Sequence, residues 1–193
     1  TTANITTLAL SVTAPDVSKV YDGDTTASGS CTVGSLASGD SVTTIPTLTF
    51  DNRNIGTDNK TLTPSAIVIK DAGAVDMTAN YNITYTPNTT SSITAKALTV
   101  TGITAENKVY NGNTTATPGG SGTLVGIVSP DVVTLNAASV AGTFASKNVG
   151  TGISVQISGL ALAGAGAGNY TLTQPTTTAN ITTLALSVTA PDV

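Results

Sequence analysis

Two lysines stand in matching sequence contexts and are the first candidates for chemistry in this chain. Lys19 begins the stretch Lys-Val-Tyr-Asp-Gly-Asp-Thr-Thr, and Lys108 begins Lys-Val-Tyr-Asn-Gly-Asn-Thr-Thr. A lysine amine beside an asparagine amide and an acidic side chain has the groups for an intramolecular isopeptide bond, which would leave the protein lighter by one ammonia. Each lysine precedes a turn in a polar segment, where a lysine usually keeps its charged end in water. We therefore expect two lysines that are either exposed or extend along the surface to bring their charge to water, without a cross-link.

The best candidates for metal ligands are four aspartates near predicted turns, Asp16, Asp22, Asp24 and Asp131. Calcium binds carboxylate and backbone carbonyl oxygens, which such positions supply. However, the second lysine motif has Asn111 and Asn113 where the first has aspartates, and the chain contains no Asp-x-Asp-x-Asp-Gly loop. We expect solvated turn carboxylates and no cofactor, with calcium as the alternative.

The residue types that most enzymes use are scarce. The chain has no histidine, so it lacks the base of a Ser-His-Asp or Cys-His pair. Glu106 is its one glutamate and falls in a connecting segment, and Cys31 is its one cysteine and fits a small strand residue. We expect no catalytic residues and no enzymatic activity.

The composition points away from nucleic acid and membrane partners. The 193 residues carry a formal net charge of −4, and only 9% of them are charged. Binding to a phosphate backbone needs clustered Lys and Arg, and the seven cations of this chain are scattered. No apolar run approaches the roughly 18 residues of a membrane-spanning helix. Regularly spaced Ile, Val and Leu in a 39% hydrophobic chain predict packed modules rather than disorder.

The chain repeats itself, and this repeat organises everything else. Residues 177–193 are identical to residues 1–17, and a diverged copy of the same motif begins halfway between them, at Ile93. A fixed period is the sequence signature of a tandem array. We predict one module over residues 5–92, a second over residues 93–180, and the first strand of a third module over residues 181–193, in a chain taken from a longer array.

The hydrophobic pattern has the period of two that is typical of half-buried strands. Alternating apolar residues run from Leu8 to Val12 and from Ile153 to Ile157, and no stretch has the spacing of an amphipathic helix. Residues 62–69, which we align with the second of these runs, are interrupted by Pro64, which favours an edge strand or a bulge. The frequent turns predict antiparallel β-sandwich modules of the immunoglobulin type. The alternative is a β-grasp-like module with one short helix.

Aromatic residues and glycines recur at matched places in the two modules. We expect them to shape the fold rather than to bind a ligand, and the set is Tyr21, Gly23, Gly56, Tyr81, Tyr110, Gly112, Gly150 and Tyr170. Asp-Gly and Asn-Gly tolerate positive φ, so Gly23 and Gly112 mark tight turns. Tyr81 and Tyr170 open the closing strand of each module. Each is either a tyrosine corner, with its hydroxyl bonded to upstream backbone, or a plain core aromatic.

The repeated motifs together resemble a known repeat family. Lys-Val-Tyr-[Asp/Asn]-Gly-x-Thr-Thr, then Asn-[Ile/Val]-Gly-Thr, then Gly-Asn-Tyr-Thr-Leu-Thr in the second module, are similar to the YDG and MBG ("mostly bacterial immunoglobulin-like") repeats. The first module departs from the pattern with Ala79 before Asn80. The resemblance covers both modules and implies tandem repeats of large bacterial surface adhesins, at an extracellular location. It brings no catalytic residues, and it adds calcium at module junctions as the chemistry that such arrays sometimes use.

These observations favour a structural role. We expect spacer modules in the stalk of a long extracellular bacterial protein, where reach grows with copy number. The expected partners are neighbouring repeats of the same chain. Two alternatives stay open, a self-assembling filament or sheath with homotypic contacts between strand edges, and a module that binds glycan or host protein directly.

Overall fold

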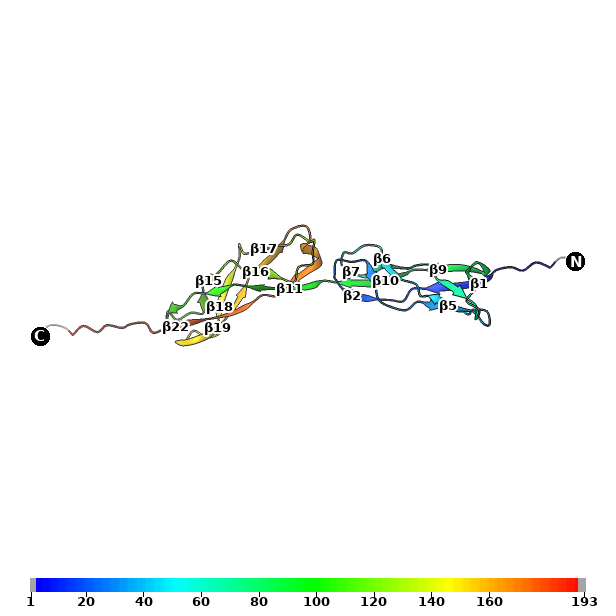
Figure 1. Ribbon diagram of the computed structural model, residues 1–193. Helices are drawn as coiled ribbons and strands as arrows, with labels where there is room; N and C mark the ends of the chain where they lie inside the picture. The colour runs from blue at the N-terminus through cyan, green and yellow to red at the C-terminus, as the bar shows by residue number, and fades with distance from the viewer. Residues whose placement is uncertain (1–2, 191–193) are drawn as a thin grey trace. The chain divides into compact units, whose positions relative to one another are not determined.

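The computed structural model describes residues 3–190, and its regular secondary structure is almost entirely β-strand (Figure 1). The chain divides into two compact modules, Thr1–Lys96 and Ala97–Val193. The helical elements among the described residues are two single turns of 3₁₀ helix, Thr78–Asn80 and Ala167–Asn169. The prediction of all-β, sandwich-like modules is confirmed, and the helix of the β-grasp alternative has no counterpart in the described part of the chain.

The first module begins with a strand whose alternate residues are buried. Its strands are β1 (Leu8–Thr13), β2 (Ser18–Val20), β3 (Thr26–Ala27), β4 (Thr32–Val33), β5 (Ser41–Thr44), β6 (Leu48–Phe50), β7 (Gly56–Pro64), β8 (Val68–Lys70), β9 (Tyr81–Thr86) and β10 (Asn88–Thr94). One sheet has the order β4-β1-β9 and a larger one the order β2-β10-β7-β6-β3, while β5 pairs with β8. A cluster of buried side chains, Leu10, Val12, Ile67, Ile69 and Tyr81, packs the first sheet against β8 and the segment before it.

The second module repeats this arrangement. Its strands are β11 (Lys96–Thr101), β12 (Thr104–Ala105), β13 (Lys108–Val109), β14 (Thr115–Ala116), β15 (Pro118–Gly119), β16 (Thr123–Val125), β17 (Thr134–Asn136), β18 (Ala141–Phe144), β19 (Gly150–Ser158), β20 (Ala161–Ala163), β21 (Tyr170–Leu172) and β22 (Thr176–Thr182). The two main sheets have the orders β16-β11-β21 and β13-β22-β19-β18-β14. The predicted alternation in β19 is present, since Val155 and Ile157 are fully buried in a core that includes Phe144 and Ile181.

The sheets are mixed rather than wholly antiparallel. In the first module β1 pairs parallel with β9, from Leu8 opposite Tyr81 to Thr13 opposite Thr86, and antiparallel with β4 (Figure 1). The closing strands β10 and β22 also pair parallel with β2 and β13. Parallel pairing needs a long crossover connection, and most of the module provides it because the opening and closing strands lie at its two chain ends.

The sequence suggested that Pro64 interrupts one strand over residues 62–69, but the structure has two separate strands here. Pro64 is the last residue of β7, which pairs with β6 and β10, whereas Val68–Lys70 belongs to the separate pair β5-β8. Proline has no N–H for a further ladder bond, so the chain leaves the sheet at this point. The true counterpart of the alternating run in β19 is therefore the second half of β7.

The division between the modules falls four residues later than the repeat motif indicates. Ile93 was expected to open the second module, but it pairs with Lys19 and Gly56 in the sheet of the first. Ile181 likewise pairs with Lys108 and Gly150 and closes the second module. Of the predicted third-module strand, residues 181–182 thus belong to β22, residues 183–190 form no strand, and residues 191–193 lie outside the described residues.

Candidate functional site

The ammonium group of Lys19 lies inside the turn that follows it. Its Nζ donates to the carboxylate of Asp22 (2.7 Å) and to the backbone carbonyls of Asp24 (2.8 Å) and Thr26 (2.9 Å). The same atom lies 5.6 Å from the centroid of the Phe50 ring, in the range of a cation–π contact. An ammonium group has three N–H donors, and all three have an oxygen partner here. The lysine thus connects the turn to the core, with a side chain that is 15% exposed.

Lys108 has the same position in the second module. Its Nζ contacts the side-chain oxygens of Asn111 (3.0 Å) and Asn113 (2.9 Å) and the carbonyls of Asn113 (2.7 Å) and Thr115 (2.9 Å). It lies 5.3 Å from the centroid of the Phe144 ring. The two lysine-centred turns therefore share backbone carbonyl acceptors and an aromatic floor. They differ in the charge of the side chains, which is the only difference that their sequence motifs carry at these positions.

The turns accept either aspartate or asparagine because they use only the acceptor oxygen. Asp22 accepts from the backbone N–H of Asp24 (3.0 Å), and Asp24 accepts from that of Thr26 (2.9 Å). Asn111 and Asn113 make the same two bonds, at 3.3 and 3.1 Å. Side chains that bond backbone two residues on stabilise tight turns, and Gly23 and Gly112, at φ 83° and 82°, supply the left-handed step.

The carboxylates of the first turn are held in their charged form. Burial by itself raises the pKa of Asp22, but hydrogen bonds from Lys19 and from the backbone N–H of Asp24 outweigh it, so the net pKa is lowered. The pKa of Asp24 is also lowered, chiefly because the backbone N–H of Thr26 donates to it. Both carboxylates therefore favour the folded turn when they are ionised.

Acid is expected to weaken the turn of the first module but not that of the second. The folded pKa values of Asp22 and Asp24 lie below the ordinary 3.8, so their contribution is complete above that value and is lost as the pH falls through the folded pKa. We expect the double variant Asp22→Asn, Asp24→Asn, which copies the second module, to keep amide protection in this turn better than the wild type between about pH 4 and pH 2. Hydrogen exchange on the intact chain measures this, and equal acid dependence of the two proteins would contradict it.

A second matched constellation joins a tyrosine to an aspartate at the starts of β9 and β21, which are the penultimate strands of their modules and not the closing strands that the sequence predicted. The Tyr81 hydroxyl donates to Asp40 Oδ2 (2.6 Å) and accepts from the backbone N–H of Ala37 (2.9 Å). The Tyr170 hydroxyl donates to Asp131 Oδ2 (2.8 Å) and accepts from a backbone N–H (3.0 Å). Both rings are buried, so the tyrosines combine the two predicted roles, a core ring and a hydroxyl bonded to upstream backbone.

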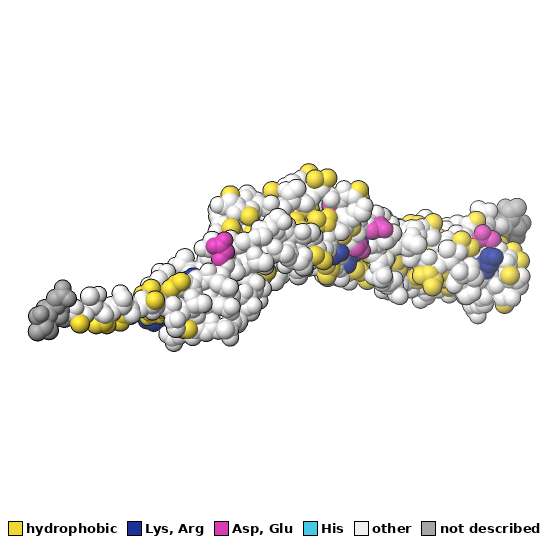
Figure 2. Space-filling view, turned by 60° about the vertical axis from the view of Figure 1, so that its left-hand side comes forward, with side chains coloured by type: hydrophobic (Ala, Val, Ile, Leu, Met, Phe, Trp, Pro, Cys, Tyr) yellow, Lys and Arg dark blue, Asp and Glu magenta, His cyan; other side chains and the backbone are white. Residues whose placement is uncertain are grey.

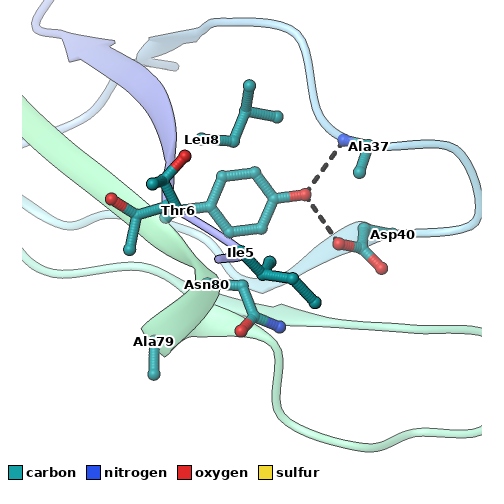
Figure 3. A pocket seen from close by; sticks show the side chains of 9 residues that line it. Ile5, Thr6, Leu8, Ala37, Asp40, Ala79 and Asn80 are labelled. Atoms are coloured by element: carbon teal, nitrogen blue, oxygen red, sulfur yellow. Dashed lines mark hydrogen bonds between the residues drawn. The ribbon is translucent and has the colours of Figure 1, made fainter. Parts of the chain in front are cut away.

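Tyr81 lines an open cleft of about 570 Å³. The hydrogen bond to Asp40 raises the pKa of this tyrosine. Figure 3 shows the two hydrogen bonds of the tyrosine hydroxyl, which join it to Ala37 and Asp40, with Ile5 and Leu8 also lining the cleft. Asp40 is therefore engaged by the tyrosine and does not point freely into the cleft. The rest of the lining consists of threonine hydroxyls, the Asn80 amide and apolar side chains.

Three of the four calcium candidates have other partners in the structure. Asp22 and Asp24 bond to the ammonium of Lys19 or to turn backbone, Asp131 accepts the tyrosine hydroxyl of the second module, and Asp16 is exposed. Within residues 3–190, no three Asp, Glu, Cys or His side chains gather into a group that could hold a metal ion. Cys31 is half-buried beside the core of the first module, and this burial raises the pKa of its thiol.

Comparison with known proteins identifies the repeated unit. The sequence model of the YDG domain matches residues 6–90 and again residues 94–179. The chain belongs to the YDG domain family. No curated protein and no solved structure matches it. In each YDG domain of this chain, the Tyr-[Asp/Asn]-Gly motif thus forms part of the turn around the lysine ammonium.

On the face that Figure 2 shows, the charged side chains do not form a large patch but are scattered among uncharged groups. In the described part of the chain, no helix has the length and apolar character needed to cross a bilayer.

Sequence reasoning missed two features of these domains. Asp40, the acceptor for Tyr81, could have been found by its matched place in a turn, since Gly39-Asp40 and Pro130-Asp131 occur in equivalent corners. The second is a contact of Lys60 with Asn52 and Asp51. The second YDG domain has Ala145 and Ser146 in place of Asp51 and Asn52, so this contact left no repeat signal.

Proposed function

We propose that this chain is a segment of a longer tandem array of YDG domains and acts as a spacer in the stalk of an extracellular bacterial surface protein, without enzymatic activity. The family membership and the two domains in series support the array. The observation that carries the proposal is the way in which three copies of one short motif are divided between modules.

The middle copy serves both modules of this chain. The motif Ile-Thr-x-x-Ala-Leu-x-Val-Thr begins at Ile5, Ile93 and Ile181. In the middle copy, Ile93 is 1% exposed at the end of β10 in the first module. Leu98 and Val100, a few residues later, are buried in β11 of the second module. Ala95 alone separates the two strands.

The outer copies use only one half each. In the first copy, Ile5 is fully exposed, while Leu10 and Val12 are buried in β1. In the last copy, Ile181 is 1% exposed in β22, while Leu186 is 89% exposed. The same motif residues are thus buried where they belong to a module of this chain and exposed where they do not. The motif is a pair of strands, one that closes a module and one that opens the next.

This division supports a spacer because it removes the linker. One residue between two strands of different modules leaves no flexible segment whose length could vary, unlike a Gly/Ser-rich connection. Each added module then adds a fixed length of chain, and reach grows with copy number. The apolar side chains of residues 184–188 would be covered by the next module, as Leu10 and Val12 are covered in the first.

The test is to supply the missing neighbour. A chain extended after Val193 by a copy of residues 18–96 should protect the amides of residues 184–189 from exchange as strongly as those of β1. A matched extended chain with Leu186→Ser and Val188→Ser should leave the third module unfolded. The array is excluded if residues 184–189 stay unprotected in the first of these chains.

The stalk role needs its own measurements. Antibodies to the YDG domains should label intact producing cells, and labelling only after lysis would exclude the extracellular location. Small-angle scattering of chains with one, two and four domains should give a maximum dimension that rises in proportion to their number. Concentration-dependent polymerisation would favour the filament instead, and a reproducible glycan-array hit would favour direct binding.

A further inference from the structure

Lys60 occupies a position where the fold itself needs no charge. Its side chain lies in β7 and the residue is 4% exposed, the one charged residue among the buried residues of the described chain. It pairs with Ser91, two residues before Ile93. The same register in the second module pairs Ile153 with Ala179, two residues before Ile181. An apolar side chain therefore fills this position in the other copy, so the lysine calls for an explanation of its own.

The buried amine contacts an amide and a carboxylate that also contact each other. Lys60 Nζ lies 2.6 Å from Asn52 Oδ1 and 3.2 Å from Asp51 Oδ1. Asn52 Nδ2 donates to Asp51 Oδ2 at 3.0 Å. The backbone holds this triangle in place, because the N–H of Asp51 donates to the carbonyl of Thr61 (2.9 Å) and that of Asn54 to Asn52 Oδ1 (3.1 Å).

We propose that Lys60 and Asn52 form an intramolecular isopeptide bond, with Asp51 transferring the protons. Asp51 takes a proton from the Lys60 ammonium, and the free amine attacks Cγ of Asn52. A new Cγ–Nζ bond forms, the Cγ–Nδ2 bond breaks, and the two protons that Nζ loses pass through Asp51 to the leaving nitrogen, which departs as ammonium. The lysine ammonium and the asparagine amide become one secondary amide and one ammonium ion, so the step needs no oxidant, metal or co-reactant.

The charge state of the carboxylate suits the first of these steps. Burial alone raises the pKa of Asp51, but the hydrogen bond and the charge of Lys60 outweigh it and lower the net pKa. Asp51 is thus an anion beside an ammonium and can act as the base. A partner that holds the proton near both nitrogen atoms is what general acid–base catalysis requires.

The two lysines of the turn motifs lack one component each. Among the contacts of the described residues, Lys19 Nζ has the carboxylate of Asp22 but no side-chain amide. Lys108 Nζ has the amides of Asn111 and Asn113 but no carboxylate. The second module also has Ala145 and Ser146 after Phe144, where the first has Asp51 and Asn52 after Phe50. The proposal is therefore one cross-link, in the first module only.

Such a bond would tie the loop after β6 to the middle of β7. These strands are neighbours in the larger sheet, with Phe50 opposite Leu62. A covalent link between them keeps the hairpin closed when the chain is pulled or partly unfolded. The closed loop is short, so the gain at equilibrium is modest, and the main effect is on resistance to force and to proteases. The proposal does not depend on the spacer role.

The mass of the purified full chain under denaturing conditions decides the matter. We expect it to be lower than the sequence mass by one ammonia, and a peptide map should contain the segments with Lys60 and Asn52 joined. A mass equal to the sequence mass overturns the proposal, whether or not any variant folds. A succinimide at Asn52 would give the same deficit, but hydroxylamine would cleave it and no joined peptide would appear, which also overturns the proposal.

Matched variants assign the groups. Lys60→Ile, the residue type of the second module, and Asp51→Asn, which keeps both the amine and the amide, should each restore the full sequence mass. Lys147→Arg, at an exposed position of the second module, should keep the deficit. A deficit that survives Lys60→Ile would place the lost ammonia elsewhere and exclude this bond.

Discussion

A chain that ends at Pro175 is expected to lose the folded second module, whereas a chain that ends at Thr182 keeps it. The two ends differ by the seven residues of β22. This strand is an inner member of the five-stranded sheet, between β13 and β19, and it buries Ala179 and Ile181. Its removal leaves the ladder bonds of β19 without partners and opens the core around Phe144, a combined loss that exceeds the about 5–15 kcal/mol stability of a typical domain.

The first module is the internal reference for this experiment. Amide exchange on each intact chain should show full protection of β1 to β10 in both, and protection of β19 only in the chain that ends at Thr182. Removal of the residues after Thr182 should change little, because Leu184, Leu186 and Val188 are exposed. A stable second module in the chain that ends at Pro175 would show that β22 is dispensable and that the motif is not divided between modules.

The predicted division before Ile93 agrees with the family match, whose second copy begins at residue 94, but the contacts divide the chain four residues later. A repeat fixes the period of an array but not its phase, since the same sequence can be cut into equal units at any point. The cut at Ile93 followed the motif, whose residues share one hydrophobic pattern across the junction. Only the pairing of Ile93 with Lys19 and Gly56, far away in sequence, shows that this residue belongs to the earlier module.

The alternation of apolar and polar residues predicted the strands well where every second side chain is buried, as in β1 and β19. Such local signals did not show what the two turn lysines bind, because four of the seven acceptors of Lys19 and Lys108 are backbone carbonyls, which every residue has and no motif displays. The contact of Lys60 with Asn52 was hidden for another reason. It depends on the register of β6 and β7, and one register shift would turn the lysine to the other face of the sheet.

Lys19→Met and Lys108→Met are each expected to destabilise their own module by about 2–3 kcal/mol. Methionine keeps most of the side-chain volume over Phe50 or Phe144 but supplies no N–H donor. The carbonyls of Asp24 and Thr26, or of Asn113 and Thr115, then lose a charged partner in a half-buried site. For domains of this size the loss corresponds to a fall in melting temperature of about 10–20 °C. Thermal unfolding followed by module-resolved amide exchange measures it.

The comparison between the two variants shows which contact matters. If the carbonyl bonds dominate, Lys19→Met and Lys108→Met cost nearly the same, and salt changes neither cost much. If the ion pair with Asp22 dominates, only Lys19→Met is costly, and its cost shrinks as salt screens the exposed carboxylate. Lys147→Met is the control, since an exposed lysine should change stability by no more than about 0.5 kcal/mol. A cost for Lys108→Met as small as that of the control would mean that the ammonium does not hold the turn of the YDG domain together.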